Sequence, residues 1–336
     1  MSKIRVLYIF RRPSADFHSI ENLFSSIQTR LPEDIQHENL FLPYHEGVLG
    51  KIKNILFVLK KHSFFRQFDL IHITGDITYI TPFIRGEKIV TYHDLGSLFA
   101  DRGSLTRKIL NLLWLRWPVR SARKITIISP STAKEVKDLI PGAETKLVYI
   151  PNCISDEWLS TDTKQREKVR YILTVGTKKN KNLERIIRAC QDTEVCLIIV
   201  GKLSDEQQKL LNNCKLEYVV WTNLQYKQIY KLYLQSDIVM FPSLYEGFGL
   251  PILEAQAIGR PLITSDIEPM SSVAGRGALK VDPLYVEQLC SALLRLIESY
   301  SLRQELVKLG RLNVDQYKCS RISHEYAKLY RNLTQK

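Results

Sequence analysis

The stretch DIVMFPSLYEGFGLPILEAQAIGRPLITS, residues 237–265, decides the fold. An apolar run, DIVMF, leads into a loop with two glycines, a helical pattern that begins near Leu250, and a second apolar run, RPLITS. Strands that alternate with helices in this way form parallel sheets covered by helices. Ligands of such sheets bind beyond the carboxyl ends of the strands, so the loop after DIVMF is where a site is expected.

The same alternation runs outward through both halves of the chain. In the first half the predicted strands are residues 4–10, 68–74, 88–93, 124–129 and 146–150, with helical patterns at 17–30 and 104–117. In the second half they are residues 171–176, 195–200, 216–221, 237–241 and 260–265. From about Tyr285 onward the pattern is helical. We therefore predict an α/β protein with two Rossmann-like, doubly wound parallel-sheet domains that face a cleft.

Between the two series lies the polar segment STDTKQREK, residues 160–168, which has no apolar periodicity and indicates a linker. A chain of 336 residues also exceeds what one compact core usually serves. We place a first domain at residues 1–155 and a second domain from residue 156.

The glycine-containing loop carries a pair of carboxylates. Glu246 lies in the loop and Glu254 on the first turns of the following helix, so both can reach one elongated ligand. Gly247 and Gly249 allow a close backbone approach, and the helix start presents free amides that suit a diphosphate. A carboxylate that accepts two hydrogen bonds also suits a ribose diol. The alternative is a tight turn followed by a solvated helix glutamate.

A second segment, VGTKKNKNLERII, follows the strand at 171–176. Lys178, Lys179 and Lys181 lie in a loop that enters a helix near Asn182, so ammonium groups and helix amides converge after a strand end. This pattern favours a phosphate clamp. A lysine-rich surface loop is the alternative.

Composition limits the class of protein. With 45% hydrophobic residues the chain can bury a sizeable core, and no run approaches the length of a membrane span. The net charge of +13 favours anionic partners: phosphates, nucleic acid or an anionic membrane. Single, scattered cysteines fit a reducing cytosol rather than a zinc site or a disulfide framework. These are Cys153, Cys190, Cys196, Cys214, Cys290 and Cys319.

The two site segments resemble the retaining glycosyltransferases of the GT-B fold, the "glycosyl transferases group 1" family that includes glycogen synthases and bacterial α-mannosyltransferases. The resemblance is strong from about Tyr171 to Pro283 and covers most of the chain. It extends through VVWTNLQYKQIYKLYLQSDIVMFPS (219–243), VAGRGALKVDP (273–283), TYHDLGSLF (91–99), IISPSTAKEV (127–136) and YIPNCI (149–154).

The resemblance implies a role for each matching position. Glu246 would hydrogen-bond the donor sugar, Glu254 would hold the nucleotide ribose, and Lys181 matches the diphosphate-binding lysine. His93 matches a histidine that lines the donor-sugar site, although a single histidine at a strand end is otherwise a structural residue. We therefore expect His93, Lys181 and Glu246 to be the catalytic residues.

Other residues are expected to bind the donor. Many members carry an arginine after the glycine of the strand end Gly176. This chain has Thr177 there, so the second positive charge must come from Lys178 or Lys179, and we assign it to Lys178. Trp221 falls where the family lays the nucleobase, and burial in the core is the alternative. Backbone amides would meet the diphosphate at Gly247, Phe248, Gly249 and Leu250.

The family fold implies that a C-terminal helix, residues 316–336, returns to the first domain. The first domain would then bind the acceptor, and residues 156–315 would bind the nucleotide-sugar. Leaving-group charge would be stabilised by Lys181 and the helix start, and an oxygen of the donor phosphate would deprotonate the acceptor. No Asp-x-Asp motif occurs, so we expect neither a metal nor another cofactor.

Two basic amphipathic stretches, residues 50–68 and 106–124, predict a further partner. Basic helices with Leu, Phe and Trp on the opposite side can lie in an anionic membrane interface. The alternative is that both are ordinary helices that bury their apolar sides on the sheet. The hypothesis is a cytoplasmic enzyme, peripheral on the inner face of the cell membrane, with a glycan or lipid-linked acceptor.

Three other functions remain open at this point. A sugar-nucleotide epimerase can share the GT-B fold, and a non-catalytic protein could hold a nucleotide-sugar without turnover. The glutamate motif argues against the first, and the four residues His93, Lys181, Glu246 and Glu254 argue against the second. A nucleic-acid binder ranks last, because the sequence has no recognition motif, zinc spacing or aromatic RNA-binding signature.

Overall fold

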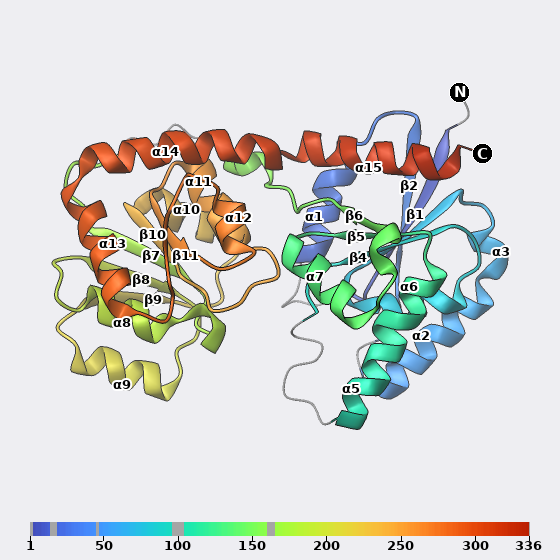
Figure 1. Cartoon of the computed structure of the whole chain (residues 1–336), viewed down its shortest axis with the longest axis horizontal. Helices are drawn as coiled ribbons and strands as arrows, with labels where there is room; N and C mark the ends of the chain where they lie inside the picture. Colours follow the sequence, from blue (N-terminus) through green and yellow to red (C-terminus); the bar gives the residue numbers. More distant parts are fainter. Residues whose placement is uncertain (1–2, 14–18, 45–46, 96–103, 160–164, 336) are drawn as a thin grey trace. The chain divides into compact units, whose positions relative to one another are not determined.

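The computed structural model describes residues 3–13, 19–44, 47–95, 104–159 and 165–335. These residues divide into two compact units, drawn in Figure 1. Unit 1 comprises Met1–Cys153 and Cys319–Lys336, and unit 2 comprises Ile154–Lys318. The chain therefore leaves unit 1, builds the whole of unit 2 and then returns to unit 1.

Unit 1 is built on a six-stranded sheet in which every pairing is parallel. Its order is β2-β1-β3-β4-β5-β6. The strands are β1 (Ile4–Phe10), β2 (Ile35–Phe41), β3 (Leu70–Thr74), β4 (Lys88–Tyr92), β5 (Lys124–Ile127) and β6 (Leu147–Tyr149). The central strands β3 and β4 are buried along their whole length, as expected for a parallel sheet with both faces covered.

Helices cover both faces of this sheet. One core cluster lies under α1 (Ser19–Gln28) and α15 (Cys319–Thr334), and the other lies under the remaining helices. These remaining helices are α2 (Val48–Lys60), α3 (His62–Phe65), η1 (Gly75–Phe83), α5 (Ser104–Leu110), the π-helical turn η2 (Asn111–Arg116), α6 (Trp117–Ser121), α7 (Pro130–Leu139) and η3 (Ala143–Lys146).

A buried hydrogen-bond chain joins α15 to the sheet of unit 1. The Tyr330 hydroxyl lies 2.7 Å from the Tyr8 hydroxyl and 2.8 Å from Nδ1 of His72, whose Nε2 lies 2.7 Å from Oγ1 of Thr91. Burial lowers the pKa of His72 to about 3, and the charge of His93 adds to that shift. His72 is therefore neutral at physiological pH and fits the hydroxyls around it.

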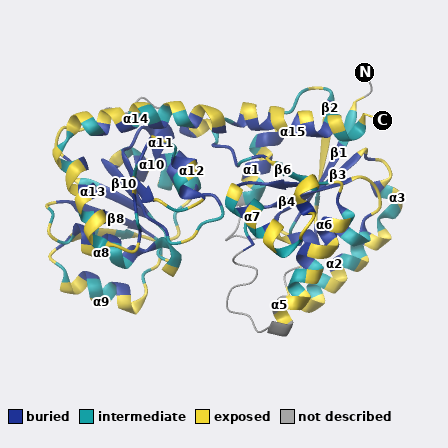
Figure 2. Ribbon diagram, in the orientation of Figure 1, coloured by how far each residue is buried: buried dark blue, intermediate teal, exposed yellow. Residues whose placement is uncertain are grey.

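Unit 2 repeats the architecture with a second parallel sheet, ordered β12-β11-β10-β7-β8-β9. Figure 2 shows its inner strands as buried. The strands are β7 (Tyr171–Val175), β8 (Cys196–Val200), β9 (Glu217–Trp221), β10 (Ile238–Phe241), β11 (Leu262–Ser265) and β12 (Leu279–Val281). Two Rossmann-like domains are thus present, as predicted.

Among the helices of unit 2, two begin at side-chain caps formed by serine. Ser204 and Gln207 form a reciprocal capping box at the start of one of them, and Ser299 caps another. The helices are η4 (Asp156–Trp158), η5 (Lys179–Lys181), α8 (Leu183–Cys190), α9 (Asp205–Asn213), α10 (Tyr226–Gln235), α11 (Leu250–Ile258), α12 (Met270–Ala274), α13 (Val286–Glu298), α14 (Tyr300–Val314) and η6 (Asp315–Tyr317).

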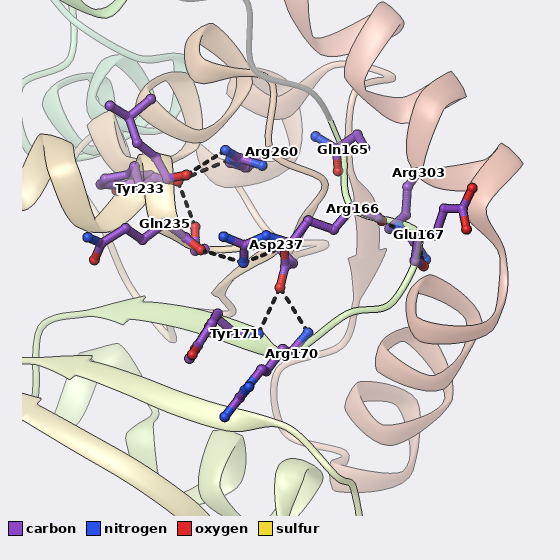
Figure 3. A network of polar contacts seen from close by, with 12 residues as sticks. Gln165, Arg166, Glu167, Arg170, Tyr171, Tyr233, Gln235, Asp237, Arg260 and Arg303 are labelled. Carbon is purple, nitrogen blue, oxygen red and sulfur yellow. Dashed lines mark hydrogen bonds and ion pairs between the residues drawn. The ribbon is translucent and has the colours of Figure 1, made fainter.

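Asp237 ties the segment after the predicted linker to the sheet of unit 2 (Figure 3). Its Oδ2 accepts hydrogen bonds from the backbone amides of Arg170 and Tyr171 at 2.8 and 2.9 Å, and its Oδ1 lies 3.3 Å from Arg166. Because Asp237 precedes β10 and Tyr171 begins β7, the two neighbouring strands start in a fixed register. Of the predicted linker, residues 160–164 lie outside the described residues.

Candidate functional site

The two predicted site loops meet at the carboxyl ends of the strands of the unit 2 sheet. They follow β7 and β10, which are neighbouring parallel strands. Nζ of Lys181 lies 2.6 Å from Oε1 of Glu246, and the two side chains are only 20% and 14% exposed. Both residues were predicted from the sequence as site residues, whereas their ion pair was not. The pair is largely shielded from water, which strengthens the interaction.

Gly176, at the end of β7, makes room for this lysine. Its φ is +98°, and a Cβ placed there would lie 2.8 Å from Cγ of Lys181. A side chain at position 176 would therefore push the lysine stem out of place, in a backbone conformation that only glycine adopts readily. The glycine is required for close packing of Lys181 as well as for the turn.

Two asparagines that the sequence analysis left without a role hold the loops together. Asn180 donates from Nδ2 to the carbonyl of Tyr245 at 3.0 Å, and its own carbonyl accepts the amide of Leu244 at 2.7 Å. Asn182 is fully buried in a left-handed conformation and donates to the carbonyls of Pro242 and Pro283. Asparagine tolerates this backbone conformation, which was the available sequence signal.

The helix α11 begins beside the ion pair. Gly249 is its N-cap, with φ +105°, and Pro251 lies in the first turn, so the helix start has the glycine and proline that such a start favours. Phe248 is buried against Tyr317, with ring centroids 5.9 Å apart. Its side chain therefore fixes the loop in the core, and the Phe248 ring is not available to a ligand.

Glu254 lies one turn into α11 and is half-buried. Its Oε2 accepts a hydrogen bond from the buried Tyr233 hydroxyl at 2.8 Å. Burial raises the pKa of Glu254 to about 7, although the Tyr233 hydrogen bond and the Lys181 charge lower it. Tyr233 itself is fixed because Arg260 donates to its carbonyl at 3.1 Å, as Figure 3 shows. The sequence analysis missed Tyr233, which lies 21 residues from its partner.

The side chains of the other expected donor-binding residues make no contact with the ion pair that the described structure shows. Oγ1 of Thr177 donates to the carbonyl of Lys202 at 2.5 Å, toward the loop after β8. Lys178 is exposed. Trp221 ends the edge strand β9 and is 44% exposed, so it is not a core residue. It lies two strands from β7 in the sheet.

His93 belongs to unit 1 and follows β4. Burial lowers its pKa to about 4, and the charge of Arg11 lowers it further while Asp94 opposes the shift. Its Nε2 is buried and has no hydrogen-bond partner among the residues that the structure describes. A neutral imidazole with one unused nitrogen can donate to or accept from a ligand hydroxyl.

Arg11 occupies the first βα turn of unit 1, and residues 11–18 of this turn contain no glycine. Its guanidinium contacts Glu21 at 3.0 Å and Asp76 at 3.3 Å. The arginine thus brings three charged residues together at the carboxyl ends of β1 and β3. Residues 14–18 of the same turn lie outside the described residues.

Comparison with known proteins supports the same family from both halves of the chain. Residues 157–312 match the model for glycosyl transferases group 1, and residues 5–158 match that for Glycosyltransferase Family 4. Together the two matches run from residue 5 to residue 312. The chain belongs to the group 1 glycosyltransferases, with the GT-B fold.

Named relatives and structures agree with this membership. The glycosyltransferase is 30% identical over 262 residues to the O-antigen chain mannosyltransferase B of Escherichia coli, which covers 68% of the chain and 66% of that protein. It is 25% identical over 210 residues to the O-antigen chain mannosyltransferase RfbU of Salmonella typhimurium, which covers 60% of the chain and 58% of that protein. The matches to these two relatives therefore span less than two thirds of their lengths.

Among solved structures, the glycosyltransferase resembles Anabaena Alr3699/HepE in complex with UDP and glucose. The TM-score is 0.75 at 14% identity, over 97% of this chain and 99% of that one, which supports the fold. Within the described residues, no three His, Cys, Asp or Glu side chains gather into a group that could hold a metal ion. None of the helices described combines the length and apolar character needed to cross a bilayer.

Proposed function

We propose that this protein is a retaining, metal-independent glycosyltransferase that moves a sugar from a UDP- or GDP-linked donor to a glycan or lipid-linked acceptor. The observation that carries the proposal is the convergence of Lys181, Glu246, Glu254 and the first turn of α11 at one sheet edge. The O-antigen mannosyltransferases among its relatives, and the UDP and glucose bound by HepE, support this class of donor and acceptor.

The leaving group determines what the site must do. A departing nucleoside diphosphate develops negative charge, which Lys181, the amides of residues 247–250 and the exposed Lys178 would stabilise. In the free enzyme Glu246 holds Lys181 at 2.6 Å, so the ammonium group is in place before the donor arrives. A preorganised cation needs little rearrangement at the moment of reaction.

The two glutamates have separate roles in the proposal. Glu254, held by Tyr233, would accept hydrogen bonds from the ribose hydroxyls through its remaining oxygen. Glu246 would accept from a hydroxyl of the donor sugar while it keeps Lys181 in position. Trp221 would stack on the nucleobase. Thr177, in the loop after β7, would line the donor site.

Retention of anomeric configuration would follow from a front-face attack. An oxygen of the donor phosphate would take the proton of the acceptor hydroxyl as the new glycosidic bond forms and the bond to the diphosphate breaks. His93, neutral and with its Nε2 unused among the described residues, would hydrogen-bond the donor sugar instead of acting as a charged acid. Analysis of the product anomer by NMR tests retention, and an inverted product would refute it.

The setting is part of the same proposal. The enzyme would act in the cytoplasm, on the inner face of the cell membrane, in the synthesis of a surface polysaccharide or glycolipid. The positive charge of the chain suits an anionic membrane and a phosphate-bearing acceptor.

A donor screen tests the proposed function. UDP, GDP and their sugars are added to the full chain in chelator-containing buffer, and thermal shift and saturation-transfer NMR report binding. One nucleotide is expected to stabilise the wild type and not Glu254→Ala, whereas Glu305→Ala, an exposed glutamate of unit 2, should behave as the wild type. Binding that appears only with Mg²⁺ or Mn²⁺ would refute metal independence, and no binding by any donor would refute the transferase assignment.

A further inference from the structure

Helix α2 is apolar on two sides. One side, with Val58, is buried in the core of unit 1. On the other side five aliphatic residues are between 40% and 79% exposed. They are Val48, Leu49, Ile52, Leu56 and Leu59. At 3.6 residues per turn they form one stripe, directed away from Val58. A surface helix normally turns a polar side to water, so this stripe has the character of a contact surface.

The second basic stretch of the sequence lies beside α2. Nζ of Lys51 in α2 lies 4.6 Å from the centre of the buried Trp114 ring in η2, so the two helical segments are in contact. Figures 1 and 2 show them along the same side of unit 1, with exposed residues on both. Ile109, Leu112 and Trp117 of this second segment are also exposed. The sequence could not show that the two stretches are adjacent.

Charge around these apolar residues has one sign. Residues 48–67 contain five Lys and Arg residues, and residues 104–124 contain six, with no Asp or Glu in either. Lys53 and Lys60 are exposed on α2, and Arg116 and Arg120 are exposed on the second segment. The eleven cations account for most of the net charge of +13. Apolar side chains bordered by cations match the acyl and phosphate layers of an anionic bilayer.

We propose that this face docks unit 1 on an anionic lipid bilayer, with the stripe of α2, Ile109, Leu112 and Trp117 at the boundary between headgroups and acyl chains. The inference rests on the proposed function in one respect: the docking would bring the enzyme to a membrane-borne acceptor. A second copy of the chain suits the face less well, because an interface between two such faces would place cations against cations.

Flotation of the full chain with phosphatidylcholine vesicles, with and without phosphatidylglycerol, tests the proposal. We expect binding to anionic vesicles to exceed binding to neutral ones by about tenfold or more, and to fall as salt rises. The double variant Ile52→Ser/Leu56→Ser should lose about tenfold in partition. Lys53→Gln/Lys60→Gln should lose about fivefold per lysine on anionic vesicles only. Leu312→Ser, at a leucine of unit 2 that is also exposed, is the control.

Three results would overturn the proposal. The first is equal binding to neutral and anionic vesicles, and the second is unchanged binding of Ile52→Ser/Leu56→Ser. The third is a concentration-dependent dimer, measured by light scattering, that the double variant abolishes without any lipid binding by the wild type. For each variant, the thermal shift caused by nucleotide is also measured, because it reports donor binding by unit 2 independently of the lipid surface. Lipid binding without any nucleotide shift would sustain this surface and refute the proposed function.

Discussion

The two units differ in the side chains that lie at the carboxyl ends of their parallel strands. In unit 2, Lys181 and Glu246 already satisfy each other, and Asn180 and Asn182 join the loops that carry them. In unit 1, His93 is half-buried and neutral, and its buried Nε2 has no partner among the described residues. The same architecture therefore has one set of strand ends whose charged side chains are already paired, and another whose histidine has a ring nitrogen without a partner among the described residues.

Removal of the cation from the ion pair of unit 2 has the largest expected effect. Lys181→Met keeps the length of the stem but leaves Glu246 without its ion-pair partner and the leaving group without its charge. We expect kcat for sugar transfer to fall by about 1,000-fold, as for other losses of a preorganised donor. Lys179→Met, an exposed lysine of the same loop, should change kcat by less than about threefold. Comparable rates for the two variants would contradict the role of Lys181.

Acid should affect the stability of the two units in opposite directions. His72 and His93 have pKa values of about 3 and about 4 in the folded state, below 6.5, so the unfolded chain takes up their protons first as pH falls. Their stabilisation is complete above pH 6.5 and is lost below it, by roughly 1 kcal/mol per pH unit for each histidine. Glu254 acts in the reverse sense, because its pKa is raised to about 7 in the folded state. Its contribution to the free energy of unfolding increases as pH falls from 7 to 4.5.

Amide hydrogen exchange, corrected for its intrinsic pH dependence, measures how the stability of each unit changes with pH in one sample. Amides of β3 and β4 should lose protection between pH 6.5 and 4.5 by more than those of β10. Replacement of the exposed His324 by Gln should leave the difference intact. Equal loss of protection in the two sheets would show that the buried histidines do not control acid stability.

Two glycines separate backbone strain from crowding at Lys181. Gly176 and Gly142 both have positive φ, but a Cβ at Gly142 would meet nothing within 4 Å. Each Gly→Ala change should lower the free energy of unfolding by about 1 kcal/mol through the backbone alone. Gly176→Ala should in addition displace Lys181 and lower kcat. Thermal melts with kinetics of both variants test this, and an active Gly176→Ala enzyme would contradict it.

The smallest expected effect concerns Tyr233, which positions Glu254. Tyr233→Phe removes a hydrogen bond that lowers the pKa of Glu254, so that pKa should rise above about 7. The pH at which donor binding weakens should rise with it, and KM for the donor should increase by about threefold to tenfold at neutral pH with kcat nearly unchanged. Tyr285→Phe, an exposed tyrosine, is the control. A fall in kcat alone would point to a different role.

Much of the fold could be predicted from apolar runs, and the two strands that were missed show the limit. β2 has the sequence IQHENLF, and five of its seven residues are exposed. β12 has only three residues. Both lie at sheet edges, where one neighbour and less burial leave no β-branched run to detect. The inner strands β7, β8, β10 and β11 were predicted because burial on both faces requires such runs.

Some features of the candidate site could likewise be predicted from local sequence, and others could not. Lys181 and Glu246 could be singled out because each follows a strand in a loop of distinctive composition. Their mutual contact, the Tyr233 hydrogen bond to Glu254 and the space left by Gly176 depend on residues brought together by the fold, so no local pattern signals them. Of the two interpretations of Trp221, exposure excludes core burial. The roles of all these residues toward a donor stay predictions.

The return of α15 to unit 1 has a consequence for synthesis on the ribosome. Tyr8, Phe24 and His72 belong to the part of the chain that is made first, yet the face they form is closed by Tyr326 and Tyr330, which are translated after the whole of unit 2. Unit 2 can complete its core while that face is still open. The earliest residues of the chain are therefore among the last to be sealed, and a nascent chain stalled within unit 2 would expose them to chaperones.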